Sequence, residues 1–130
     1  MCLAIDITPF EPEAPAAPNV ASVATAIPVE ECGGQLTISE EGGCACSLLA
    51  DTADWNHAEW DLRPDVREPL AQTVCALAAR YRAGFTLTAV WIGDPIKAEV
   101  AISPAELAVA LRGNHLRNWT RYVVYPTPAV

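Results

Sequence analysis

The strongest constraint in this 130-residue sequence is a stretch with helical periodicity near its middle. Its apolar residues recur every three or four positions and form one continuous stripe: Val66, Leu70, Val74, Leu77 and Tyr81. Asp65 can cap the start of a helix, and Gly84 can end it. We therefore predict a helix over residues 66–82, with Pro69 tolerated in its first turn.

Alternating or continuous apolar runs on both sides of this helix predict strands. They are residues 1–8, 20–31, 35–39, 44–49, 85–92, 98–103 and 120–126. We expect 35–39 and 44–49 to form a hairpin around a loop that contains glycine. We also expect 98–103 to run back along 85–92 after a turn.

A second helix is predicted from a capping signal. Ser103 stands at the cap, Pro104 at the first helical position and Glu106 at the third, which together make a capping box. This helix should run to Arg112 and stop at Gly113. Because the strands cluster instead of alternating with helices, we predict an α+β fold. It would be a single domain over residues 1–130, with a mostly antiparallel sheet of about five to six strands and two helices packed on one face.

The composition favours a soluble, acidic protein. More than half of the residues are hydrophobic, which is enough for a full core, and a Pro-rich stretch over about 9–19 reads as a stiff loop. No apolar run is long enough for a membrane helix, and the N-terminus lacks the features of a secretory signal. We therefore expect a cytoplasmic location with reduced thiols, and no membrane partner.

Charge is distributed unevenly along the chain. The net charge is −8, but residues 1–62 hold 11 acids and no Lys or Arg, whereas residues 63–130 hold 5 acids and 8 bases. The acidic half can attract the other half of the domain, or it can meet a protein with a basic surface. Nucleic acid is disfavoured as a partner, because its phosphates repel a protein of this net charge.

A polar and aromatic segment at residues 54–61 is the preferred binding surface. Tryptophans are strong interface anchors, and carboxylates surround them. The candidate binding residues are Trp55, His57, Glu59, Trp60 and Asp61. His57 beside carboxylates could act as a base, but the sequence has no partner nucleophile and none of the common catalytic motifs. The sequence therefore favours a small domain that binds proteins over an enzyme.

A second hypothesis rests on the pair Cys44 and Cys46, with Cys2 as a further thiol. Thiolates bind zinc and other soft metals, and a Cys exposed by removal of Met1 could use its own amine as a base. Against this, the spacing does not match the common zinc sites, and free cysteines are among the most buried residue types. The alternatives are a thiol or metal-binding protein that uses this pair, or two small core side chains and no cofactor.

A basic and aromatic patch lies near the C-terminus and extends into the last predicted strand. It contains Arg112, His115, Arg117, Trp119 and Arg121. Such a patch could stack on single-stranded nucleic acid. The preferred interpretation is a helix end and a strand, whose arginines complement the helix dipole and the acidic half of the chain.

Four short motifs spread over the chain resemble a family of small bacterial proteins. They are the Met1-Cys2 start, Gly43-Cys44-x-Cys46, Trp91-x-Gly93-Asp94 and Tyr122-Val123-Val124. That family has no established activity. The resemblance therefore implies a compact bacterial domain and adds no mechanism or cofactor.

Overall fold

The computed structural model describes residues 3–11, 27, 29–32, 35–38, 45–50 and 58–125. Its elements follow one another in chain order: β1 (Leu3–Pro9), β2 (Val29–Cys32), β3 (Gln35–Ile38), the 3-10 helix η2 (Cys46–Leu48), α1 (Pro64–Arg80), β4 (Phe85–Trp91), β5 (Ala98–Ile102), α2 (Pro104–Arg112) and β6 (Thr120–Val124). Most of the predicted strand 20–31 and of the Pro-rich loop lies outside the described residues. No helix in the described part is long and apolar enough to cross a membrane.

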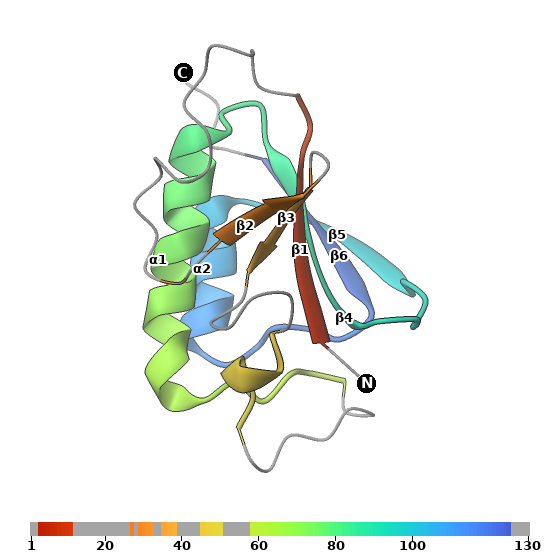
Figure 1. Ribbon diagram of the computed structural model, residues 1–130. Coiled ribbons are helices and arrows are strands. Elements are labelled where there is room, and N and C mark those ends of the chain that lie inside the picture. Colours follow the sequence, from red (N-terminus) through yellow and green to blue (C-terminus); the bar gives the residue numbers. More distant parts are fainter. Residues whose placement is uncertain are drawn as a thin grey trace.

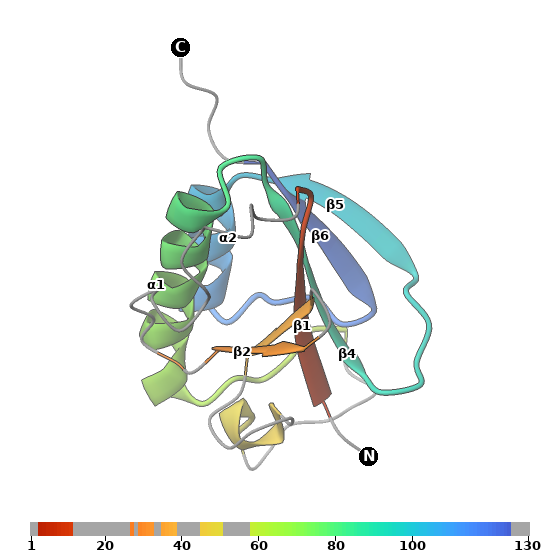
Figure 2. The ribbon, with the colours of Figure 1, turned by 45° about the horizontal axis from the view of Figure 1, so that its top comes forward.

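The described strands form a six-stranded sheet in the order β2-β3-β1-β4-β6-β5. Every neighbouring pair is antiparallel except β5 and β6, which run parallel. Both α-helices pack against each other on one side of this sheet (Figures 1 and 2). The predicted α+β class, with a mostly antiparallel sheet and two helices on one face, is confirmed.

The two central strands supply the apolar floor beneath the helices. Leu3, Ile5 and Ile7 of β1 are fully buried, and in register Ile5 pairs with Ala89 and Ile7 with Leu87. Successive side chains of a strand point to opposite faces, so the residues between them lie on the other side of the sheet. The strands predicted over residues 1–8 and 85–92 are therefore confirmed as β1 and β4.

Helix α1 begins two residues earlier than predicted. Pro64 occupies the first helical position, where its missing N–H costs nothing, and the cap residue is Arg63. Asp65 therefore lies inside the first turn and is not the cap. The predicted stripe is confirmed, because all five of its residues are buried. After the helix, Gly84 adopts φ +106° and lies so close to the Val124 carbonyl oxygen that a Cβ would be 2.7 Å from it.

Helix α2 has the predicted bounds. The Ser103 hydroxyl accepts a hydrogen bond from the Glu106 N–H at 3.1 Å, and the helix ends at Arg112 with Gly113 as its C-cap. Arg112 then forms an ion pair with Glu68 on α1. The hydrogen bond from Arg112 holds the pKa of the Glu68 carboxyl below its ordinary value.

Two strand pairings were predicted wrongly. Within the described part of 44–49, Cys46–Leu48 form the 3-10 helix η2. Strand β3 pairs with β2 and β1 instead, so neither edge of β3 is open to a return strand. Strand β5 does not run back along β4. The connection through α2 makes β5 parallel to β6, and β6 takes the place beside β4.

Candidate functional site

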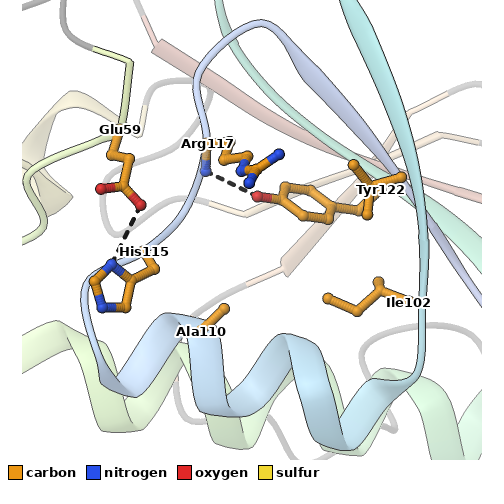
Figure 3. Close-up of a pocket in the computed structure, with 7 residues that line it drawn as sticks. Glu59, Ile102, Ala110, His115, Arg117 and Tyr122 are labelled. Atoms are coloured by element: carbon orange, nitrogen blue, oxygen red, sulfur yellow. Dashed lines mark hydrogen bonds and ion pairs between the residues drawn. The ribbon is translucent and has the colours of Figure 1, made fainter.

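A pocket of about 440 Å³ lies between α2, the edge strand β5 and the connection from α2 to β6. One wall is apolar and is formed by Val100 and Ile102 of β5 and by Ala110 of α2. The remaining lining residues are polar: Glu59, His115, Arg117 and Tyr122. Figure 3 shows these side chains arranged around a common space, with Ala110 and Ile102 opposite Arg117.

Two segments far apart in sequence run side by side to build the polar end of this pocket. Backbone hydrogen bonds join Trp60 N–H to the Leu116 carbonyl at 2.8 Å and Asn118 N–H to the Ala58 carbonyl at 2.9 Å. Between these bonds, Glu59 and Arg117 face each other as an antiparallel bridge. The pairing therefore brings a carboxylate from residues 58–60 against the basic side chains of the α2–β6 connection.

Asn114 fixes this pairing at the end nearest α2. It adopts the left-handed φ of 62°, which asparagine tolerates better than most residues. Its side-chain oxygen accepts the Leu62 N–H at 2.9 Å, and its amide donates to the Asp61 carboxylate at 3.1 Å. One side chain, just after the end of α2, thus holds residues 61–62.

The polar end of the pocket combines an imidazole–carboxylate contact and a phenol. His115 Nδ1 lies 3.2 Å from the Glu59 carboxylate, as the dashed line in Figure 3 shows. The Tyr122 hydroxyl accepts the Arg117 backbone N–H at 2.8 Å, so its own proton is left to donate elsewhere. Burial raises the pKa of Tyr122 above its ordinary value, which keeps this hydroxyl protonated at neutral pH.

The guanidinium of Arg117 is the cation that this pocket offers. Arg112 and Arg121 are ion-paired with Glu68 and Glu99, but within the described ranges no carboxylate lies within ion-pair distance of Arg117. Figure 3 shows its side chain directed toward Tyr122, above the apolar wall. An unpaired guanidinium beside apolar surface is suited to a carboxylate that belongs to a partly apolar ligand.

The structure separates the residues of the predicted 54–61 surface. Trp55 and His57 lie outside the described residues, whereas Glu59 lines the pocket. Trp60 is only 1% exposed, so its predicted place at a binding surface is wrong. Its indole N–H donates to the Ala89 carbonyl at 3.0 Å and its ring meets Trp91 edge-on, which makes it a core residue.

Asp61, the last residue of the predicted surface, contacts the α2–β6 connection. Besides the hydrogen bond from Asn114, its carboxylate lies 3.9 Å from the Arg67 guanidinium. Asp61 therefore helps to position Glu59 but does not line the pocket. With the Glu59–His115 pair, these contacts join the acidic and basic halves, as one of the two interpretations of the charge pattern expects.

Of the three predicted thiol or metal residues, the structure describes Cys46. Cys2 and Cys44 lie outside the described residues. Cys46 is half-buried in η2, where its sulfur accepts the Leu3 N–H at 3.1 Å. Among the residues that can be described, no three His, Cys, Asp or Glu side chains gather as metal ligands. A role for Cys44 and Cys2 stays a prediction.

The Trp-x-Gly-Asp motif has a structural role. Gly93 takes φ +98° in a tight turn closed by the Asp94 N–H and the Trp91 carbonyl, at 3.0 Å. The Asp94 carboxylate accepts the Trp119 indole N–H at 3.0 Å, and the Lys97 ammonium lies 4.2 Å from the centre of the Trp119 ring. This motif therefore anchors the residue that precedes β6, beside the pocket.

Sequence reasoning missed the connection between Glu59 and the basic patch. His115 and Arg117 were recognised in that patch, but their carboxylate neighbour lies more than fifty residues earlier. The alternation of Trp60 and Leu62 with Glu59 and Asp61 was an available signal, since it predicts an extended, half-buried segment. Tyr122 carried no such signal beyond its place in a strand.

Comparisons with protein-family models, curated proteins and solved structures found no match. The resemblance to small bacterial proteins therefore stays a prediction. The chemistry of the site has to be judged from its own residues. None of the pocket-lining side chains is Ser, Thr or Cys, so the described lining offers a guanidinium, a phenol and an imidazole–carboxylate pair but no hydroxyl or thiol nucleophile of these kinds.

Proposed function

We propose that this protein is a small binding domain that holds an extended segment of a partner protein in the pocket beside β5. The observation that carries this proposal is the Arg117 guanidinium at the polar end of an apolar-walled pocket, which has no carboxylate partner among the described residues. A ligand that fills such a site needs an apolar group and a carboxylate. Protein segments supply both in neighbouring side chains.

The position of β5 explains why the ligand would be extended. Among the described strands β5 is at the end of the sheet and pairs only with β6, so its outer side can accept another strand. Val100 and Ile102 point into the pocket, whereas Glu99 and Ala101 lie on the opposite face. A strand added beside β5 would direct every second side chain toward the same pocket.

Two contacts would then select the partner. An apolar side chain would pack against Val100, Ile102 and Ala110, and an acidic side chain would pair with Arg117. The sequence also predicts that the acidic half meets a partner with a basic surface. The residues of that half mostly lie outside the described part. That second contact surface stays a prediction.

The test is a selection of random extended peptides displayed on phage against the wild-type protein. Selected peptides should combine an apolar and an acidic residue, and should lose at least tenfold in affinity for Ala110→Trp, which fills the pocket. Val109→Trp is the matched control, because its neighbouring position on α2 is 66% exposed and lies outside the pocket lining. Arg117→Glu should abolish the preference for acidic residues, whereas Arg82→Glu should not.

Selected peptides that bind Ala110→Trp and Val109→Trp equally well would contradict the proposed binding site. So would a selection that yields no peptide with an acidic residue. Far-UV circular dichroism of each variant shows whether its fold is intact before binding is compared.

A further inference from the structure

The face of the sheet that lies away from α1 and α2 carries a row of polar side chains. The strand registers place Asp6 opposite both Thr37 and Thr88, and Arg121 opposite both Thr88 and Glu99. The row therefore crosses five strands in the order Thr37, Asp6, Thr88, Arg121, Glu99. No helix of the described chain covers this face (Figures 1 and 2).

The Asp6 carboxylate has no ion-pair partner among the described residues. It is half-buried and accepts a hydrogen bond from the Thr37 hydroxyl at 3.2 Å, and within the described residues no Lys, Arg or His reaches ion-pair distance. Burial raises its pKa, as expected for a carboxylate that has lost water without gaining a positive neighbour. A cation supplied from outside would relieve this cost.

Arg121 is the nearest basic residue of the row and points to the same face. It is exposed and its guanidinium lies 3.6 Å from the Glu99 carboxylate, an exposed pair of small energetic value. Asp6 and Arg121 also line one shallow hollow of about 390 Å³, together with Thr8, Thr86 and Thr88. The strand β4 separates them, so they are about two strand spacings, or ~10 Å, apart at the backbone.

This arrangement is self-complementary. Thr88 is in register with both charged residues and stands between them. A two-fold axis through Thr88 would place Asp6 of one copy against Arg121 of the other, and Arg121 against Asp6, so both charge contacts form at once. The hollow gives the long Arg121 side chain of the second copy room to reach the half-buried carboxylate.

We propose that this face is a homodimer interface in which Asp6 pairs with Arg121 of a second copy across a two-fold axis at Thr88. The interface is independent of the pocket beside β5. Six strands about 4.8 Å apart and some five residues long give a face of roughly 400 Å² per copy, about half the size of a standard interface. The dimer is therefore weak, and it loosens as salt screens its charges.

The test is sedimentation velocity over a wide range of concentration, with charge-reversal variants. Asp6→Arg brings two guanidinium groups together at each contact, and Arg121→Asp brings two carboxylates together. Each should weaken the dimer at least tenfold, since like charges across an interface are strongly unfavourable. Mixing the two variants should restore association, because every contact in the mixed dimer is again between opposite charges.

Controls and a second variant keep the outcome clear. Glu11→Arg and Arg82→Asp make the same charge changes at exposed positions outside the row and should leave the dimer unchanged. If Asp6→Arg does not fold, Thr88→Lys takes its place, because it sets two ammonium groups against each other at the axis. A wild-type protein that stays monomeric at high concentration and low salt overturns the proposal. So does a dimer that is indifferent to Arg121→Asp and to Thr88→Lys.

Discussion

Replacement of Asn114 by alanine is expected to lower the free energy of unfolding by about 3 kcal/mol, although the residue is only partly buried. Three contributions make up this expected loss of stability. Alanine in the left-handed region, at the φ of 62° found here, costs about 1 kcal/mol more than asparagine. The Leu62 N–H loses its acceptor inside a fully buried residue, which costs about 1.5 kcal/mol. The lost hydrogen bond to Asp61 is worth about 0.5 kcal/mol.

A series at this position separates strain from hydrogen bonding. Asn114→Gly removes the strain but also both hydrogen bonds, so it should be more stable than Asn114→Ala by about 1 kcal/mol. Asn114→Asp keeps an acceptor for Leu62 N–H but places a second carboxylate beside Asp61, and should fall between the wild type and Asn114→Ala. Urea unfolding followed by tryptophan fluorescence gives these differences, provided that the m-value does not change.

Two results would refute this account. Equal stabilities of Asn114→Ala and Asn114→Gly would show that the left-handed backbone carries no strain. A loss below about 1 kcal/mol in Asn114→Ala would show that the Leu62 N–H finds water or another acceptor. Amide hydrogen exchange at Leu62 provides an independent check, because its protection should fall in Asn114→Ala.

Three further outcomes are expected. Trp60→Phe should lower the free energy of unfolding by about 2–3 kcal/mol, because it removes the hydrogen bond to the Ala89 carbonyl and leaves a void. Urea unfolding measures this loss, and a loss below about 1 kcal/mol would contradict the role of Trp60 in the core. Gly84→Ala should lower the free energy of unfolding by more than about 2 kcal/mol, because the new Cβ would clash with the Val124 carbonyl oxygen and the residue would keep a positive φ. An unchanged midpoint of thermal unfolding would contradict this prediction. Burial raises the pKa of the Asp6 carboxyl in the folded state. As pH rises above about 4, the carboxyl therefore loses its proton more readily in the unfolded chain than in the folded protein, and the free energy of unfolding falls toward neutral pH. The stability of Asp6→Asn relative to the wild type should therefore increase from pH 3 to pH 7, as measured by urea unfolding at high dilution. A stability difference that does not change with pH would contradict a raised pKa at Asp6.

Local signals in the sequence predicted the helices well. The capping box at Ser103 and the stripe from Val66 to Tyr81 depend on residues within one or two turns, and both are found in the structure. The start of α1 was misplaced by two residues because Asp65 and Pro64 are both good N-terminal residues, and the proline took the first helical position. Alternation of apolar residues likewise predicted β1 and β4.

Strand partners could not be predicted in the same way. Nothing near residues 44–49 shows that β2 and β1 already flank β3, and an apolar run is compatible with either a strand or a short helix. The polar end of the candidate pocket could not be predicted for the same reason. The contact between Glu59 and His115 depends on how residues 58–62 pair with the α2–β6 connection, and that pairing is a property of the assembled fold.

The location of the pocket follows from the parallel unit of β5, α2 and β6. Only Ser103 separates the end of β5 from the start of α2, so this connection leaves no chain to build a site. The return from α2 to β6 is longer, with seven residues between Arg112 and Thr120, and it must pass from the helix layer back to the sheet at the opposite end of the strands. Loops of this kind carry functional side chains because the elements on both sides hold them in place. His115 and Arg117 lie in this return and Glu59 pairs with it, so the polar end of the pocket forms between the return and the inward-facing side chains of β5 and β6.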